Sequence, residues 1–421
     1  MNILVLNSGS SSQKAAVYCI EKPPGDDPQE PVWQGRIEWD GTLRRDRAQI
    51  EVSNLRGARV NNRVEAESRK QATSQLLASI WSGAAAVLRS PEEIAIAGHR
   101  VVNGGREFRE SAIITPAVKG AIERMAALAP LHNRAELDGI ETLELKCGNL
   151  PQVAVFDTAF HSRMPDAAAI YPGPYEWTEQ GIRRFGFHGI NHQYCTQRAA
   201  RMLRRELARL RMITCHLGNG CSLAAIRDGH SIDTTMGFTP LEGLMMGTRS
   251  GSVDPGILTH LMRRANLSGE QIDELLNHQS GLLGISGVSG DMREIVAAMK
   301  QGHARAKLAF DIFVHRLKAG IGAMAAALGG VDALIFSAGI GENSPEVRAA
   351  TCAALEFLDV KLDAKKNENP ILDADVSAGG ARVRVLVIRA QEDWAIAREC
   401  WRLAPAKARS ERRSSESYGK N

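Results

Sequence analysis

Two short turns of small polar residues have the composition of phosphate-binding loops. Asn7-Ser8-Gly9-Ser10-Ser11-Ser12 follows an apolar run near the N-terminus, and His216-Leu217-Gly218-Asn219-Gly220 follows a similar run about two hundred residues later. Glycine and serine turns let several backbone N–H groups converge on one anion. We interpret the two strand–turn–strand segments as a weak internal repeat whose halves face one polyphosphate, although ordinary hairpins share this composition.

A glycine-rich segment carries an isolated arginine. Residues 233–256 contain five glycines, two prolines and Arg249. Ordering such a segment costs conformational entropy, and long loops inside compact enzymes are often functional. Guanidinium groups suit phosphate and carboxylate oxygens. Arg249 is therefore a candidate anion ligand, with a long structural connection as the alternative.

Other nucleotide and metal motifs are missing or incomplete. The sequence has no G-x-x-x-x-G-K-[ST] motif, and Gly339-Ile340-Gly341 lacks the third glycine of a dinucleotide fingerprint. His188 and His192 have the i, i+4 spacing of a helical metal pair, but Gly189 disfavours a helix there. We expect His192 to cap or pack, and His188 to donate into a cleft.

Hydrophobic patterning predicts the elements that position these residues. Strands are predicted at 3–7, 14–20, 32–39, 48–53, 153–156, 333–337 and on both sides of the turn in 213–226, and helices at 70–88, 117–128, 191–210 and 304–328. The glycines at 339–341 are predicted to form a turn before a helix that begins at Glu342-Asn343. Residues 191–210 form a basic face that we interpret as solvated, with anion binding as the alternative. Gly320 and Gly322 predict close packing of the longest helix.

The composition is that of an ordinary globular protein. Of 421 residues, 44% are apolar and 24% are charged, and the net charge of +4 gives no strong case for a nucleic-acid or membrane partner. The seven cysteines have no C-x-x-C or zinc spacing, which suits a reducing compartment. The N-terminus lacks signal-peptide features, and no apolar run reaches membrane-spanning length. These features predict a cytoplasmic protein.

Taken in order, the motifs of this sequence resemble the acetate kinase family, within the superfamily of actin, sugar kinases and heat-shock chaperone ATPase domains. The resemblance covers residue 2 to about residue 400. The matching segments are 7–12, 98–102, 128–133, 156–161, 186–189, 216–220, 233–256, 339–343 and Glu392-Asp393.

The resemblance implies a role for each matching residue. Asn7 and Glu392 are expected to hold Mg²⁺, with Mn²⁺ as an alternative metal. The expected catalytic residues are Asp157, His188, Arg249 and Arg100. The expected contacts to ATP or ADP are Ser10, Ser12, Lys14, His216, Leu217, Gly218, Asn219, Gly220, Asp291, Met292, Arg293, Gly339, Ile340, Gly341, Glu342 and Asn343. The acid would lie against Arg100 and a methyl pocket of Val102, Leu131, Phe187 and Pro240.

The implied reaction is reversible in-line phosphoryl transfer from ATP to acetate, giving acetyl phosphate and ADP. A carboxylate is already ionised at neutral pH, so no general base is needed. The arginines, His188, Lys14 and Mg²⁺ would neutralise the repulsion between acid and polyphosphate, while Asp157 would orient an arginine or metal-bound water. Rival functions are a propionate or butyrate kinase of the same family, and a catalytically silent actin-like nucleotide-binding protein.

A few positions depart from the family pattern. Asn103 stands where the family usually has histidine, and Arg134 where it usually has proline. Ile190-Asn191 and Gln13 also depart, and the loop at 21–31 is longer than expected. Because Asn103 and Arg134 border the expected acid site, they bear on substrate preference and rate.

The fold implied by the resemblance is α/β, with two actin-like (ribonuclease H-like) domains that have mixed sheets and flanking helices around a nucleotide cleft. The first domain is expected at 1–157 plus a helix at 393–405, and it would carry the acid and phosphate side. The second is expected at 158–392, for nucleotide binding and homodimer formation. Residues 406–421 are expected to be a disordered tail.

Overall fold

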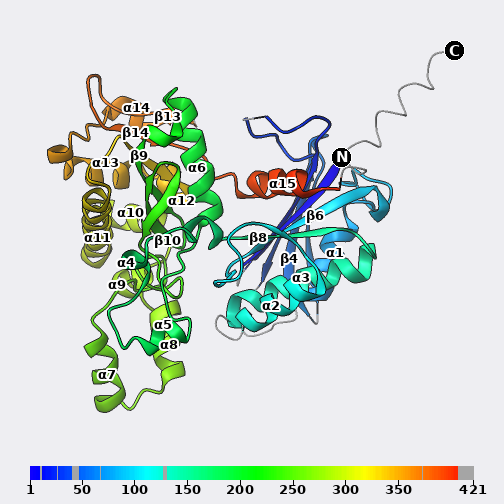
Figure 1. The fold of residues 1–421 in the computed structure, drawn as a ribbon, viewed down its shortest axis with the longest axis horizontal. Helices are drawn as coiled ribbons and strands as arrows, with labels where there is room; N and C mark the ends of the chain where they lie inside the picture. The colour runs from blue at the N-terminus through cyan, green and yellow to red at the C-terminus, as the bar shows by residue number, and fades with distance from the viewer. Residues whose placement is uncertain are drawn as a thin grey trace. The chain divides into compact units, whose positions relative to one another are not determined.

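A computed structural model describes residues 1–9, 12–25, 27–39, 47–66, 68–126, 130–371 and 373–405; the side chains of Arg47, Ala126 and residues 130–134 lie outside this description. The chain forms two compact units, one of Met1–Ala159 with the segment from Gln391, and one of Phe160–Ala390 (Figure 1). Glu392 therefore belongs to the first unit, whereas the expected division placed it in the second. Among the described residues, no helix is long and apolar enough to cross a membrane.

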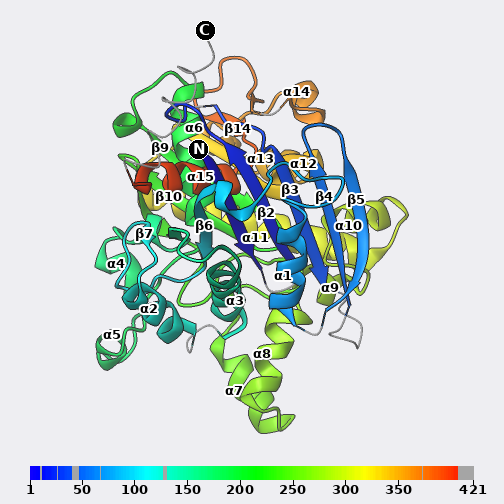
Figure 2. The ribbon, with the colours of Figure 1, turned by 90° about the vertical axis from the view of Figure 1, so that its right-hand side faces the viewer.

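The first unit is built on a mixed sheet with the order β5-β4-β3-β2-β1-β6-β8-β7. Its strands are β1 (Asn2–Ser8), β2 (Ser12–Cys19), β3 (Trp33–Trp39), β4 (Arg47–Asn54), β5 (Arg59–Glu65), β6 (Ile94–Val101), β7 (Ala112–Ile113) and β8 (Gln152–Phe156). The five strands β1–β5 pair antiparallel, whereas β1 pairs parallel with β6, and β6 with β8. Figure 2 shows β1–β5 side by side.

Helices cover both faces of this sheet. They are α1 (Arg69–Ala78), α2 (Pro116–Ala126), α3 (Pro130–Cys147) and α15 (Glu392–Leu403), with a short 3₁₀ helix at Pro91–Glu93. Ala97 packs in the cluster that includes Leu76 and Leu143 of α1 and α3, while a Cβ at Gly98 would meet Ile396 and Cys400 of α15. Since neighbouring strand residues point to opposite faces, α15 covers one face and α1 and α3 cover the other.

The second unit is built on a sheet with the order β11-β10-β9-β12-β14-β13. Its strands are β9 (Arg211–Leu217), β10 (Cys221–Arg227), β11 (His230–Thr234), β12 (Ala333–Ser337), β13 (Ala374–Asp375) and β14 (Arg384–Val387). β9, β10 and β11 pair antiparallel, while β9, β12 and β14 pair parallel. The helices are α4 (Asp166–Ala169), α5 (Glu176–Glu179), α6 (Gly189–Met202), α7 (Pro255–Arg264), α8 (Gly269–His278), α9 (Gly281–Ser286), α10 (Met292–Lys300), α11 (Ala304–Leu328), α12 (Ala338–Asn343), α13 (Pro345–Ala353) and α14 (Ala364–Glu368), with 3₁₀ turns at Ala159–His161, Leu207–Arg209 and Glu356–Leu358.

The two sheets have the same topology. The order β3-β2-β1-β6-β8-β7 in the first matches β11-β10-β9-β12-β14-β13 in the second, and the short edge strand of each precedes its neighbour in the chain. β4 and β5 extend only the first sheet. The hairpins predicted as an internal repeat are therefore the equivalent β1–β2 and β9–β10 pairs of two related sheets.

Two predicted helices are too long. The helix predicted at 70–88 ends at Ala78, because the Ser79 hydroxyl bonds the carbonyl of Leu76 and Gly83 adopts a left-handed φ of 83°. The helix predicted at 191–210 ends at Met202, because Arg204 takes a φ of 52° and the N–H of Arg205 bonds the carbonyl of Ala200.

Two glycine predictions also need correction. Residues 339–343 belong to the short helix α12 and the next helix begins at Pro345, so this segment is not a simple turn. In α11, a Cβ at Gly320 would lie 2.8 Å from Leu223, which confirms close packing there. No neighbour within 4 Å crowds such a Cβ at Gly322, so the packing prediction was wrong for that residue. The tail at 406–421 lies outside the described residues.

Candidate active site

Polar side chains gather where three strands of the first sheet end. Asn7 lies near the end of β1, Arg100 near the end of β6, and Asp157 directly after β8. These strands pair in parallel, so their carboxyl ends lie at one edge of the sheet. The N–H of Asp157 also donates to the carbonyl of Val101, which continues the ladder past the end of β8. This edge is where open α/β sheets commonly bind ligands.

Arg100 and Asp157 form a buried ion pair at this edge. The Nη2 and Nε atoms of Arg100 donate to Asp157 Oδ2 at 2.6 and 3.1 Å. The Asp157 side chain is fully buried, and that of Arg100 is 16% exposed. Burial opposes the charge of Arg100, but the carboxylates of Asp157 and Glu392 offset this and raise its pKa. Asp157 is therefore engaged in holding Arg100 in place, one of the two orienting roles predicted for it.

The first turn of α15 brings acids to the end of β1. The Asn7 amide donates to Glu392 Oε2 and Asp393 Oδ1, at 3.3 Å each. Burial raises the pKa of Asp393, and Glu392 adds to this effect, while Lys14, the cross-strand partner of Asn7, opposes it. The result is a partly buried concentration of carboxylate oxygens that a cation would stabilise.

This donor set fits Mg²⁺. Magnesium is usually bound by one or two carboxylates, with water and substrate phosphates completing its shell, and Glu392, Asp393 and the Asn7 amide supply oxygens of the right kind. Within the described ranges, no group of three or more His, Cys, Asp or Glu side chains is arranged to hold a metal. The side chains present would supply part of the shell of a bound Mg²⁺, and water and substrate phosphates would supply the rest.

A buried glutamate lies beneath the ion pair. Glu136 of α3 accepts the N–H of Val102 through Oε1 at 2.9 Å, while its Oε2 is buried with no hydrogen-bond partner among the described residues. Burial raises the pKa of Glu136 to about 8, because the nearby charge of Arg100 compensates only in part. Glu136 thereby holds the backbone of Val102, one of the residues predicted for the acid pocket.

The corresponding edge of the second sheet carries imidazole, hydroxyl and amide side chains. His216 near the end of β9 and Ser337 at the end of β12 are partners in the parallel pairing. Asn191 of α6 links them, since its Nδ2 group donates to His216 Nδ1 at 2.9 Å and to Ser337 Oγ at 3.2 Å. The ring of His188 stacks on that of His216 with centroids 4.0 Å apart.

His188 begins a chain of buried hydrogen bonds. It is the N-cap residue of α6, with a left-handed φ of 57° that is uncommon for a residue with a Cβ. Its Nδ1 lies 2.9 Å from Ser222 Oγ, which lies 2.8 Å from His192 Nε2, and His192 Nδ1 lies 2.7 Å from Thr214 Oγ1. His192 is fully buried, and burial holds its pKa well below the ordinary range. His192 is thus a packing residue, as predicted, but Gly189 opens a helix instead of breaking one.

The glycine-rich segment is fastened to the second turn. Residues 235–254, all of them described, form no helix or strand, yet the N–H of Gly247 donates to the carbonyl of Asn219 at 3.0 Å. A Cβ built at Gly220 would lie 3.2 Å from His188 Nε2 and 3.6 Å from Arg249 Nη1. The segment therefore brings Arg249 to the same side of the turn as His188, which supports its predicted anion-binding role.

Within the second unit, two further segments were predicted to contact the nucleotide. Asp291 caps α10 and pairs with the largely exposed Arg293, and the preceding Gly290 abuts Gly247 beside the turn. In α12, Glu342 Oε1 accepts the N–H groups of Ala338 and Ala390, at 2.8 Å each. The Glu342 carboxylate therefore holds the start of α12 and the backbone at Ala390 together.

The residues predicted for the acid pocket come from both units. Val102 is a buried residue of the first unit, while Phe187 and Pro240 belong to the second, where the carbonyl of Pro240 accepts Arg249 Nη1 at 3.3 Å. Ser10 and the side chain of Leu131 lie outside the described part of the chain, as does the side chain of Arg134. Asn103 is buried, and its Oδ1 accepts the N–H of Gly105 at 2.8 Å.

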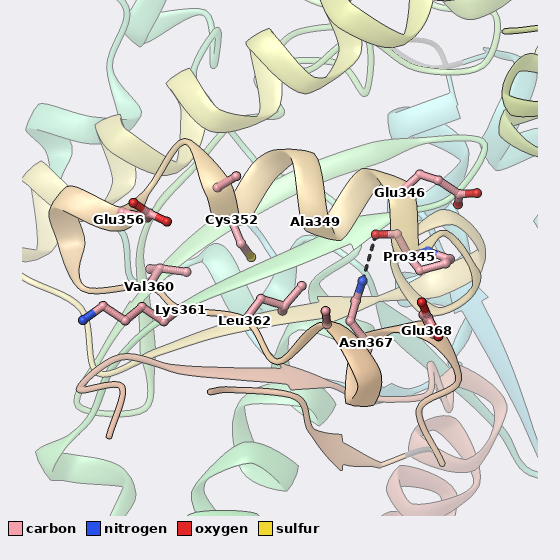
Figure 3. A pocket seen from close by; sticks show the side chains of 12 residues that line it. Pro345, Glu346, Ala349, Cys352, Glu356, Val360, Lys361, Leu362, Asn367 and Glu368 are labelled. Atoms are coloured by element: carbon pink, nitrogen blue, oxygen red, sulfur yellow. Dashed lines mark hydrogen bonds between the residues drawn. The ribbon is translucent and has the colours of Figure 1, made fainter. Parts of the chain in front are cut away.

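A cavity of about 500 Å³ lies between α13 and α14 (Figure 3). Its wall includes Cys352, Lys361 and Asn367, whose side-chain amide donates to the carbonyl of Pro345 at 3.0 Å. None of the predicted site residues is among those that line it.

Sequence reasoning missed the residues that hold the others in place. Glu136, Asn191, Thr214, Ser222 and Asp393 were given no role. Asp393 is part of the matching motif Glu392-Asp393, and Ser222 lies two residues after the 216–220 turn, which is a usable signal. Thr214 and Glu136 look like ordinary strand and helix residues, and only their buried hydrogen bonds distinguish them.

Comparisons with known proteins agree with this arrangement. The model of the acetokinase family matches residues 2–398. A protein named acetate kinase from Cyanothece sp. is 56% identical over 410 residues, covering 97% of this chain and all of the relative. The crystal structure of Porphyromonas gingivalis acetate kinase has a TM-score of 0.87 at 40% identity, covering 96% of this chain and all of that chain. A propionate kinase structure from Francisella tularensis has a TM-score of 0.85 at 37% identity, covering 94% and 98%.

Proposed function

The chain belongs to the acetokinase family, and from this premise we propose that it catalyses reversible phosphoryl transfer from ATP to acetate, giving acetyl phosphate and ADP. The observation that carries the proposal is the likeness, over almost the whole of both chains, to a protein named acetate kinase. The geometry at the two sheet edges supports it, because each edge supplies groups that this reaction needs.

In the first unit, Arg100 is proposed to bind the acid and the transferred group. Its guanidinium is oriented by Asp157 through two hydrogen bonds, and oriented guanidinium groups are well suited to carboxylate and phosphoryl oxygens. Asn7 and Glu392, with Asp393 beside them, would hold Mg²⁺, which supplies positive charge against the phosphates when bound. Ser12 and Lys14 would line the phosphate side of the first hairpin.

In the second unit, residues 216–220 are proposed as the second phosphate turn, with His188 and Arg249 stabilising the transferred group. Both side chains face the position where a Cβ of Gly220 would stand. Asp291–Arg293 and 339–343 are proposed to hold the adenosine part. Because the acid is already ionised, these residues need only position the reactants and neutralise charge.

A formation assay for acyl phosphate tests the proposal. Purified protein with ATP, Mg²⁺, acetate and hydroxylamine should accumulate acetyl hydroxamate, and omission of Mg²⁺ should abolish the product. Folded protein that forms no hydroxamate with any short acid would refute the proposal.

The second candidate is a propionate kinase, favoured by the similarity to the Francisella tularensis structure. One methylene in an apolar pocket is worth only about 1–3 kcal/mol of discrimination. We therefore expect kcat/KM to be highest for acetate and about 10- to 200-fold lower for propionate. A higher value for propionate than for acetate would reverse the assignment.

We also propose that the protein is a cytoplasmic homodimer that forms through the second unit. This proposal rests on the family to which the chain belongs. Sedimentation equilibrium of the full chain should give twice the monomer mass of 45.7 kDa.

A further inference from the structure

We propose that Thr214, His192 and Ser222 are positioning residues that keep the His188 proton on Nε2, and that Asn191 does the same for His216. The two stacked rings would then present neutral N–H donors toward the 218–220 turn. The inference rests on the proposed function only where it takes this turn as a phosphate site.

The four residues that are linked by these hydrogen bonds are all buried. Ser222 and His192 are fully buried, Thr214 is 1% exposed and His188 is 9% exposed. The distances from Thr214 to His192, from His192 to Ser222 and from Ser222 to His188 are 2.7, 2.8 and 2.9 Å. All three lie in the ordinary hydrogen-bond range. In such a buried site, a polar hydrogen without an acceptor destabilises the fold, because water cannot reach it to accept a hydrogen bond.

The number of hydrogens that need an acceptor decides the direction of this series of hydrogen bonds. If Thr214 donates to His192 Nδ1, then His192 Nε2–H donates to Ser222 and the Ser222 hydroxyl donates to His188 Nδ1. Every hydroxyl hydrogen then has an acceptor, and the His188 proton must be on Nε2. In the opposite direction His192 would donate to Thr214, whose own hydrogen would have no acceptor among the described residues. The first direction is therefore favoured.

His216 is held in the same tautomer by a different residue. Its Nδ1 accepts the amide N–H of Asn191 at 2.9 Å, and the Asn191 Oδ1 is oriented by the thiol of Cys195. A lone pair must therefore be on Nδ1 and the proton on Nε2. The Nε2 atoms of the two rings lie 3.2 and 3.7 Å from Cβ positions built at Gly220 and Gly218. Because both positions are glycine, no side chain of the turn stands between its backbone and these two nitrogen atoms.

The proposal requires His188 to stay neutral. If Nδ1 of His188 were protonated, the Ser222 hydroxyl would have to turn its hydrogen toward His192 Nε2. Because that nitrogen already carries a hydrogen, the Ser222 hydrogen would have no acceptor there. Titratable or charged groups close to the pair include His216 on β9, Arg249 on the glycine-rich segment, His192 on α6, and His161 against His192. A positive charge on His188 would lie beside Arg249, which is unfavourable at short range.

Nitrogen NMR of the full chain tests the tautomers directly and needs no substrate. With ¹⁵N-histidine labelling, correlations of His188 and His216 should show protonated Nε2 and unprotonated Nδ1, unchanged between pH 8 and pH 6. Loss of single signals in His188→Gln and His216→Gln provides the assignment. A protonated Nδ1 on His188, or titration near its ordinary pKa of about 6.5, overturns the proposal.

Variants of Thr214 test this series of hydrogen bonds through the NMR signals of His188 and through kcat. Thr214→Val removes the donor that sets the direction, so the His188 signals should become a mixture of tautomers, and kcat should fall about three- to tenfold with little change in the KM for ATP. Thr214→Ser should restore both properties. The control is Thr351→Val, since Thr351 is equally buried and its hydroxyl has no partner among the described residues; it should leave both unchanged.

These outcomes separate the inference from the proposed function. Wild-type protein that makes no acyl phosphate removes the function, while the NMR pattern still decides the tautomers. Thr214→Val with wild-type His188 signals overturns the inference even if the protein is an active kinase.

Discussion

The same edge of two related sheets carries paired charges in one unit and imidazole, hydroxyl and amide groups in the other. The first unit places Arg100, Asp157, Glu392 and Asp393 at the ends of β1, β6 and β8. The second places His216 and Ser337 at the ends of β9 and β12, linked by Asn191. Equivalent strand positions thus support two kinds of polar cluster.

The difference shows how one topology can divide an electrostatic task. Buried charges are tolerated only when they are paired. In the first cluster, the carboxylates accordingly lie near the positive charges of Arg100 and Lys14. Neutral donors can be buried at less cost if each hydrogen has an acceptor, and the second cluster satisfies this through hydroxyl, imidazole and amide groups. Arg249 adds its charge from a loop, outside the strand ends.

The largest effect should follow from breaking the charged cluster. Asp157→Ala leaves Arg100 buried without its carboxylate, and loss of one partner of a buried pair typically costs ~3–5 kcal/mol. Urea unfolding should show a decrease of this size in the free energy of unfolding. Asp157→Asn, which keeps an acceptor oxygen, should lose less. Equal stability of wild type and Asp157→Ala would mean that the pair does not contribute as described.

Removing the charge that Arg249 brings from the loop beside the second cluster should affect rate more than stability. Arg249→Ala is expected to lower kcat about 10²- to 10³-fold, because it removes a donor that acts on developing charge. The dissociation constant of ATP, measured by calorimetry, should change much less. Arg263→Ala on α7, where the arginine is exposed, serves as the control. A normal kcat in Arg249→Ala would refute the assigned role.

A smaller, pH-dependent effect should come from Glu136. Its folded-state pKa of about 8 lies above the ordinary 4.5, so the folded protein binds the extra proton between these values. This contribution to stability is present below about pH 4.5 and is lost as pH rises toward 8, by an amount on the order of a few kcal/mol.

Glu136→Gln should therefore lose less stability than wild type when urea midpoints are compared at pH 5.5 and 7.5. Glu141→Gln on the same helix is the matched control, because a hydrogen bond from Lys70 lowers the pKa of Glu141. Parallel pH profiles for wild type and Glu136→Gln would show that Glu136 is ionised in the folded protein.

Local patterns predicted the elements best where the signal was continuous. The helix at 304–328 and the strand at 333–337 have the predicted bounds, since long periodic segments and short buried apolar runs are strong signals. Helix ends were harder, because Arg204 and Ser79 end their helices through backbone hydrogen bonds that composition does not reveal. The predicted internal repeat of the two hairpins appears as a topology that the two sheets share.

The sequence by itself determined the two hairpins, the residue types able to neutralise phosphate charge, and the family through motifs in a fixed order. Only the tertiary structure decided which partner each polar group has. Asn191 and Ser337 meet across 146 positions, and Arg100 and Asp157 meet because parallel strands end together. Hydrogen bonds act over about 3 Å, so a sequence can supply the partners, but the packing of distant strands selects among them.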